Sequence, residues 1–132
     1  MRLALQLASD RSGLTGENPS VGCVIVKNNE VISIGQTGIN GRPHAENNAI
    51  VNSREKLNKS NLYVTLEPCS HHGKTPPCTN IFKEHGISEV FIGMLDPNPK
   101  VNGNGIKELE KNKIITHVGI KQKESMKRKA LV

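Results

Sequence analysis

The stretch VGCVIVKNNEVISIGQT, residues 21–37, carries the clearest fold signal in the chain. Two apolar runs rich in β-branched residues, 21–27 and 31–37, stand on either side of Asn28 and Asn29. β-Branched residues favour strands, and a two-residue asparagine turn is typical of a tight hairpin. The stretch therefore predicts two antiparallel strands joined by a short turn.

Helices and strands are expected to alternate on both sides of this hairpin. Before it, residues 1–13 should form an amphipathic helix with Leu3, Leu7 and Leu14 in its apolar stripe. After it, hydrophobic periodicity predicts a helix at 44–57, a strand at 61–66, a helix at 78–86, a strand at 87–95, a helix at 106–113 and a strand at 114–120. The full order is α-β-β-α-β-α-β-α-β.

This order of elements predicts the α/β class. Strands separated by a helix are joined by crossovers and lie parallel, whereas the opening hairpin adds an antiparallel edge. We therefore expect a mixed five-stranded sheet with helices packed on both of its faces.

The composition is that of one ordinary globular domain, with 132 residues of which 35% are hydrophobic and 23% charged. We assign residues 1–120 to the domain and residues 121–132 to a basic tail or the start of a linker. Within the tail, residues 121–129 hold five Lys or Arg and one Glu, which is most of the net charge of +6. With no Trp, one Tyr and two Phe, the chain offers few rings on which bases could stack, so we expect no nucleic-acid partner.

The sequence also bears on the cellular compartment. Its apolar runs are all much shorter than the about 18 residues of a membrane span, and its N-terminus lacks the long apolar core of a signal peptide. Three cysteines without an export signal favour a reducing compartment, so we expect a cytoplasmic protein with no membrane partner. In that setting, cysteines near histidines favour a metal site or catalysis over a disulfide.

Three possible metal ligands stand where expected strands end or helices begin. His44 begins one helix, Cys69 follows a strand, and Cys78 begins the next helix. Strand ends and helix starts of an open α/β sheet meet along one rim, so these side chains can converge. One imidazole and two thiolates form a soft tetrahedral set that suits Zn²⁺ and leaves the fourth position to water.

Glu46 lies two residues after His44, where it is well placed to accept a proton from that water and hand it on. Zinc-dependent base deaminases carry H-x-E followed by P-C-x-x-C. This chain has HAE at 44–46 and Pro68-Cys69, but eight residues, not two, separate Cys69 from Cys78. The pattern predicts a hydrolytic deaminase with an enlarged loop between its cysteines.

Four stretches carry a resemblance to a known family: NPSVGCVIV (18–26), GRPHAE (41–46), LYVTLEPCSHHGKTPPC (62–78) and IGMLDPNPKVNGNGI (92–106). In them the chain resembles the diaminohydroxyphosphoribosylaminopyrimidine deaminases of bacterial riboflavin biosynthesis. The resemblance implies a cytidine-deaminase-like three-layer α/β/α fold and a zinc-dependent hydrolase. The implied reaction converts 2,5-diamino-6-ribosylamino-4(3H)-pyrimidinone 5′-phosphate to 5-amino-6-ribosylaminouracil 5′-phosphate and ammonia.

The same resemblance implies roles for individual residues. It places Zn²⁺ on His44, Cys69 and Cys78, the catalytic proton shuttle on Glu46, and substrate contacts on Asn18, Lys74, Asp96 and Asn98. Lysine suits a phosphate as a point charge, whereas aspartate and asparagine suit ribose hydroxyls. Family members usually continue into an NADPH-dependent reductase domain, so we expect a reductase partner in trans or on a longer chain, and a homo-oligomer.

Two other functions stay open on the residues alone. One is a tRNA or nucleoside base deaminase of the same superfamily, for which steeply salt-dependent RNA binding would be the mark. The other is a non-catalytic module stabilised by zinc, which would need a closed four-ligand site. Cys23 could supply the fourth ligand, although its place in an apolar run favours the core.

Several polar residues near the motifs also have alternative roles. His71 or His72 could replace His44 as a ligand, and Glu67 could bond either a substrate or a backbone amide. Two glycines, Gly103 and Gly105, could cradle a phosphate before the following helix. His117 is expected to be a satisfied histidine on an edge strand.

Overall fold

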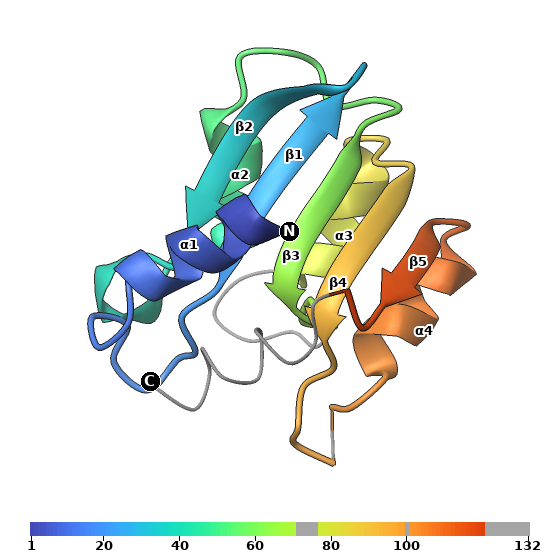
Figure 1. The fold of residues 1–132 in the computed structure, drawn as a ribbon. Helices are drawn as coiled ribbons and strands as arrows, with labels where there is room; N and C mark the ends of the chain where they lie inside the picture. The colour runs from blue at the N-terminus through green and yellow to red at the C-terminus, as the bar shows by residue number, and fades with distance from the viewer. Residues whose placement is uncertain (71–76, 100, 121–132) are drawn as a thin grey trace.

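The computed structural model describes residues 1–70, 77–99 and 101–120. In chain order the elements are α1 (Arg2–Asp10), β1 (Gly22–Lys27), β2 (Glu30–Gln36), a 3-10 turn η1 (Ile39–Gly41), α2 (Ala45–Asn52), β3 (Asn61–Leu66), α3 (Cys78–Glu84), β4 (Glu89–Met94), α4 (Asn104–Lys111) and β5 (Ile115–Val118). The five strands form one sheet in the order β2-β1-β3-β4-β5 (Figure 1). The predicted α/β class and order of elements are confirmed.

The β1–β2 hairpin closes as its asparagines predict. Asn28 and Asn29 have φ angles of 52° and 64°, so both adopt the left-handed conformation that a two-residue hairpin turn requires. β1 runs antiparallel to β2 and to β3, whereas β3, β4 and β5 are mutually parallel. The sheet is therefore mixed, with its antiparallel part formed by the hairpin.

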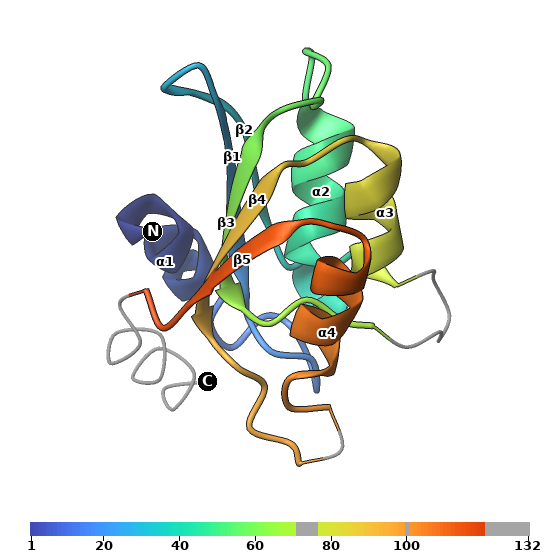
Figure 2. The same ribbon diagram turned by 90° about the vertical axis from the view of Figure 1, so that its right-hand side faces the viewer.

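Helices cover both faces of the sheet. Figure 2 shows α1 on one face and α2, α3 and α4 together on the other. The close approach of α1 depends on Gly22, because a Cβ atom there would lie 1.8 Å from the carbonyl oxygen of Ala4. Behind this contact, Ala4 and Leu7 pack on Val24 of β1 in a small cluster of their own. The result is the three-layer arrangement that the resemblance implied.

The main core fills the space between the sheet and α2, α3 and α4. Its largest fully buried members come from both the strands and the helices: Ile25, Leu62, Val64, Phe82, Val90, Ile92 and Leu109. Each such apolar side chain contributes roughly 1.5–3 kcal/mol relative to exposure to water. This core fixes α2 and α3 against the parallel strands whose ends carry the predicted site.

The position of α2 is set by contacts with β2. A Cβ atom at Gly35 would lie 2.3 Å from the carbonyl oxygen of Ala45 and 2.4 Å from the amide nitrogen of Ala49, so only glycine permits this approach. Nδ2 of Asn48 donates to the carbonyl oxygen of Gln36 at 2.8 Å, and the Ser33 hydroxyl donates to the carbonyl of Ala49. These contacts hold the first turn of α2 beside the end of β2.

Some predicted element boundaries are wrong. The first helix ends at Asp10, and Leu3 and Leu14 are 44% and 50% exposed, because α1 packs through its alanines and Leu7 instead. The helix predicted to reach Leu57 ends at Asn52, where Ser53 turns to an extended conformation; Leu57 is nevertheless buried in the following loop. Within the described ranges, no helix is both long and apolar enough to span a bilayer.

Candidate active site

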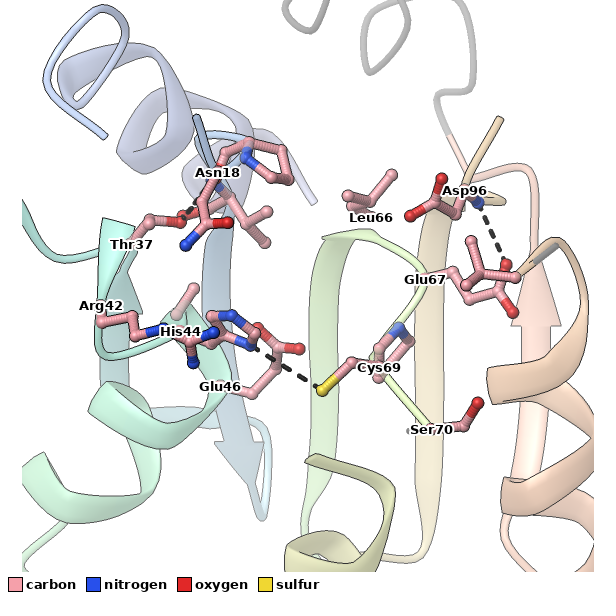
Figure 3. A pocket seen from close by; sticks show the side chains of 15 residues that line it. Asn18, Thr37, Arg42, His44, Glu46, Leu66, Glu67, Cys69, Ser70 and Asp96 are labelled. Carbon is pink, nitrogen blue, oxygen red and sulfur yellow. Dashed lines mark hydrogen bonds between the residues drawn. The ribbon is translucent and has the colours of Figure 1, made fainter. Parts of the chain in front are cut away.

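A pocket opens at the rim of the sheet where β3 and β4 end and α2 begins (Figure 3). Its volume is about 200 Å³. The residues that line it come from segments far apart in the sequence and include Asn18, Thr37, Arg42, His44, Glu46, Glu67, Cys69, Asp96 and Val101. The pocket therefore lies at the rim of the sheet that the order of elements predicts. Three of the predicted site residues, His44, Glu46 and Cys69, line it.

His44, Cys69 and Cys78 form a compact cluster at this pocket. Their ligand atoms all lie within 4.8 Å of one another. Sγ of Cys69 is 3.5 Å from Sγ of Cys78, and Nδ1 of His44 is 3.8 Å from each sulfur. Tetrahedral zinc with Zn–S bonds of about 2.3 Å and Zn–N bonds of about 2.0–2.1 Å separates its ligand atoms by roughly 3.5–3.8 Å. The side chains present fit such an ion in both chemistry and spacing.

The local backbone explains how these three side chains meet. His44 is the extended residue that caps α2, and Cys78 is the first residue of α3. Cys69 follows β3, and its sulfur accepts the amide N–H of Cys78 at 3.4 Å, while its carbonyl oxygen accepts that of Thr79. The start of α3 is thus tied directly to the segment after β3, which holds the two cysteines together.

The pKa values of the two thiols are shifted in opposite directions. Hydrogen bonding from Cys78, followed by contact with His44, lowers the pKa of Cys69 to about 4 despite burial. The same hydrogen bond, together with burial, raises the pKa of Cys78 well above the ordinary thiol range. The bond to Cys69 also raises the pKa of His44. A divalent cation bound between the two sulfurs would favour the ionised form of both thiols.

Glu46 lies in the first turn of α2 with its side chain next to this cluster. It is 5% exposed, and burial raises the pKa of its carboxyl to about 7. A backbone hydrogen bond of Glu46, the neighbouring His44 and hydrogen bonding to Cys78 lower this pKa and oppose burial, whereas Cys69 raises it further. Figure 3 shows Glu46 beside His44 on one wall of the pocket and Cys69 on the facing wall.

Of the four residues predicted to contact substrate, two line the pocket, one lies outside it, and one is not among the described residues. Asn18 and Asp96 both line the pocket, and Nδ2 of Asn18 donates to the carbonyl oxygen of Gly41 at 3.0 Å. Asn98 is exposed and is not among the lining residues; its amide N–H donates to Oδ1 of Asp96 at 2.9 Å. Lys74 lies outside the described residues, so its role stays a prediction.

Sequence reasoning missed several residues of the pocket. Arg42 and Thr37 line it, and so does Val101, which adds an apolar wall. The signal for Arg42 was its place in GRPHAE, two residues before His44. Thr37 lies in no motif, so the sequence carries no such signal for it. In the structure its hydroxyl accepts the amide N–H of Val21 at 2.9 Å and donates to the carbonyl oxygen of Pro19.

The alternative roles of the other cysteine and histidines are also resolved in part. Cys23 is completely buried in the main core, apart from the His44 cluster, and burial raises its pKa well above the ordinary range. His117 lies on the edge strand β5, with Nε2 2.9 Å from a carboxylate oxygen of Glu89, as expected. His71 and His72 lie outside the described residues.

The hydrogen bonds of Glu67 decide its own role and the role of Gly103 and Gly105. Its buried carboxylate accepts the amide N–H groups of Asp96, Gly103 and Gly105. Of the two roles open to it, Glu67 therefore has the backbone one. The suggestion that Gly103 and Gly105 cradle a phosphate is wrong, because a carboxylate of the chain already occupies their amides.

Comparison with known proteins agrees with this geometry. The sequence profile of the cytidine and deoxycytidylate deaminase zinc-binding region matches residues 1–94. The chain belongs to this family. Its similar proteins include proteins of riboflavin biosynthesis, as its motifs predicted.

Two curated relatives show how far the similarity extends. A diaminohydroxyphosphoribosylamino-pyrimidine deaminase from Buchnera aphidicola (subspecies Acyrthosiphon pisum) is 47% identical over 95% of this chain and 85% of its own length. The riboflavin biosynthesis protein RibD from another Buchnera aphidicola (subspecies Baizongia pistaciae) is 49% identical over 96% of this chain. The chain spans only 34% of that RibD protein.

Solved structures give the same result. A diaminohydroxyphosphoribosylaminopyrimidine deaminase/5-amino-6-(5-phosphoribosylamino)uracil reductase from Thermotoga maritima matches with a TM-score of 0.93 and 44% identity, covering 98% of this chain and 38% of that one. A dCMP deaminase from cyanophage S-TIM5 matches with a TM-score of 0.65 at 22% identity, which shows a shared fold. The predicted cytidine-deaminase-like fold is confirmed.

Proposed function

We propose that this chain catalyses the hydrolytic deamination of 2,5-diamino-6-ribosylamino-4(3H)-pyrimidinone 5′-phosphate to 5-amino-6-ribosylaminouracil 5′-phosphate and ammonia. The observation that carries the proposal is the buried carboxyl of Glu46 beside the His44, Cys69 and Cys78 cluster at the pocket. The names of two similar proteins described above, the Buchnera deaminase and the Thermotoga deaminase/reductase, support the choice of substrate.

Zinc is the proposed cofactor, with His44, Cys69 and Cys78 as the residues that would hold it. Their imidazole and thiolate donors and their separations support this choice. When bound, zinc supplies a water whose pKa is lowered far enough for attack at neutral pH. A purely structural metal would have no use for a buried carboxyl at its side, so Glu46 supports an open, reactive site.

Glu46 moves the protons of the reaction. It takes one proton from the attacking water as the new C–O bond forms at the amine-bearing ring carbon, and it delivers this proton to the adjacent ring nitrogen. Glu46 then takes a second proton from the hydroxyl group on the same carbon and passes it to the amine as the C–N bond breaks, so that a carbonyl group forms and ammonia leaves. One buried carboxylate at the edge of the pocket is sufficient for both transfers.

The substrate would be recognised from opposite sides of the pocket. Asn18 and Asp96 offer polar groups to the pyrimidine and ribose, and Figure 3 shows them on opposite sides of the opening. Arg42 adds a positive charge at the pocket, which suits an anionic substrate. We keep Asn98 as a ribose contact and Lys74 as a phosphate contact; both rest on the family resemblance.

A reductase would act on the product. The Thermotoga relative is described as both deaminase and reductase, and the chain matches 38% of it. We infer that a reductase, in trans or on a longer chain, takes up the deaminated pyrimidine. The free thiols of Cys23, Cys69 and Cys78 suit a reducing compartment, so we place this step in the cytoplasm. A homo-oligomer remains part of the proposal.

A direct assay tests the proposed function. The zinc-loaded chain is incubated with the phosphorylated diaminopyrimidine, and ammonia release is followed together with the ultraviolet spectrum of the ring. We expect turnover of this compound and little or none of cytidine or of a tRNA anticodon stem. Preferential deamination of cytidine or tRNA would replace the proposed substrate, and the absence of any deamination by zinc-loaded protein would overturn the proposal.

A further inference from the structure

Glu67 connects the metal-ligand segment to the loop that carries Asp96. Its side chain is 7% exposed and lies two residues before Cys69, at the end of β3. Oε1 accepts the amide N–H of Asp96 at 3.0 Å and that of Gly103 at 3.1 Å, while Oε2 accepts that of Gly105 at 2.8 Å. One carboxylate therefore holds both ends of the loop between β4 and α4.

These hydrogen bonds are of a strong kind. A carboxylate that accepts backbone N–H groups forms charge-assisted bonds, about twice as strong as neutral ones. Gly103 and Gly105 are at the start of α4, where the helix dipole also favours a negative charge. The cost of burying the Glu67 side chain is offset by its hydrogen bonds to three backbone N–H groups.

The loop is packed tightly against the segment after β3. A Cβ atom at Gly105 would lie 2.3 Å from the carbonyl oxygen of Pro68 and 3.1 Å from Oε2 of Glu67. The main chain adds a further tie, because the amide N–H of Glu67 donates to the carbonyl oxygen of Met94 at 2.9 Å. The start of α4 and the approach to Cys69 thus touch without intervening space.

Asp96 depends on this contact for its place at the pocket. Within the loop, its Oδ1 accepts the amide N–H of Asn98 at 2.9 Å, and its carbonyl oxygen accepts Nδ2 of Asn102 at 3.0 Å. Both partners belong to the same loop and would move with it. The bond from the Asp96 amide to Glu67, drawn in Figure 3, instead ties the residue to the end of β3.

We propose that Glu67 is a positioning residue for substrate binding. It holds Asp96 at the pocket through the Asp96 backbone amide, and the metal cluster does not depend on it. The inference rests on the proposed function for its kinetic consequence. Its structural part, that one carboxylate ties the amides of Asp96, Gly103 and Gly105 together, stands on the geometry alone.

Glu67→Gln is the variant that tests it. Glutamine has nearly the same shape, but an NH2 group replaces one of the two carboxylate oxygens. This group is a donor, so it cannot accept the backbone N–H that the replaced oxygen accepts in the unmodified chain. We expect the KM for the phosphorylated diaminopyrimidine to rise roughly tenfold, the usual effect of losing a charge-assisted hydrogen bond. The zinc content should remain that of the unmodified chain, and kcat should change less than KM.

A double-mutant cycle separates positioning from general stability. If Glu67 acts through Asp96, adding Glu67→Gln to Asp96→Ala should raise KM little beyond Asp96→Ala alone. Glu89→Gln is the matched control, because the Glu89 carboxylate pairs with His117 away from the pocket, and its KM should be unchanged. Additive effects of the two substitutions, or an unchanged KM in Glu67→Gln, would overturn the inference.

Hydrogen exchange tests the structural part whatever the substrate. The amides of Asp96, Gly103 and Gly105 should exchange faster in Glu67→Gln than in Glu89→Gln. Unchanged protection at these amides would refute the inference even if the deaminase assay succeeds, and faster exchange would support it even if the proposed substrate is wrong. If Glu67→Gln does not fold, Glu67→Asp, shorter by one methylene, carries the same expectations.

Discussion

The Nδ1 atom of His44 lies 3.8 Å from the Sγ atom of Cys69, although 25 positions separate the two residues in the chain. The first begins α2 and the second follows β3, so the contact exists only because the sheet brings the start of a helix to the end of a neighbouring strand. The proposed zinc site and the proposed role of Glu46 depend on that relationship, since it creates the cluster beside the pocket.

Replacing a cysteine of the cluster should abolish metal retention. We expect Cys69→Ala and Cys78→Ala each to purify with little zinc, because two remaining ligands cannot hold the ion against exchange. Elemental analysis measures the loss. Cys23→Ala is the matched control, because Cys23 is buried in the core outside the cluster, and it should keep its zinc. Full zinc content in Cys69→Ala or Cys78→Ala would contradict the assigned ligands.

Removal of Lys74 should weaken binding of the substrate phosphate. A lysine that meets a phosphate contributes roughly 1.5–3 kcal/mol, so Lys74→Ala should raise KM by about tenfold or more. The dephosphorylated analogue provides the control, since its KM should hardly respond. If both compounds lose affinity equally, Lys74 does not bind the phosphate.

A side chain at Gly35 should displace α2. In Gly35→Ala, the new methyl group would meet the backbone of Ala45 and Ala49 at 2.3–2.4 Å, and overpacking of this kind costs typically 1–3 kcal/mol. We expect a lower free energy of unfolding by chemical denaturation and weaker zinc binding, because His44 moves with the helix. Val51→Ala, at a site on α2 that is 75% exposed, should change stability by less than about 0.5 kcal/mol. Equal stability of the two variants would show that α2 is not held by this contact.

The parts of the fold that depend on local chemistry could be predicted from the sequence. Asn28 and Asn29 predicted a tight turn because few residues accept a left-handed backbone, and both adopt it. The convergence of His44, Cys69 and Cys78 followed from a general property of α/β sheets, whose strand ends meet helix starts at one rim.

The parts that depend on tertiary packing could not be predicted. The sequence around Glu67 allows two roles, because nothing in it reveals that the amides of Gly103 and Gly105 lie beside this side chain in the fold. Leu3 was placed in the apolar stripe of the first helix, yet it is exposed, since small alanines allow α1 to approach the sheet along a different face. The motif GRPHAE contains Arg42 but does not reveal that its side chain lines the pocket, because that depends on how the loop before α2 folds.

The central claim is that Glu46 carries protons in a zinc-dependent deamination, and one paired measurement tests it most directly. Zinc content and kcat for the phosphorylated diaminopyrimidine are determined in the unmodified chain and in Glu46→Gln. We predict equal zinc content and a kcat lower by a factor of roughly 10² to 10⁴, the usual contribution of a general acid–base. A Glu46→Gln variant that retains zinc and deaminates at nearly the original rate would contradict the account.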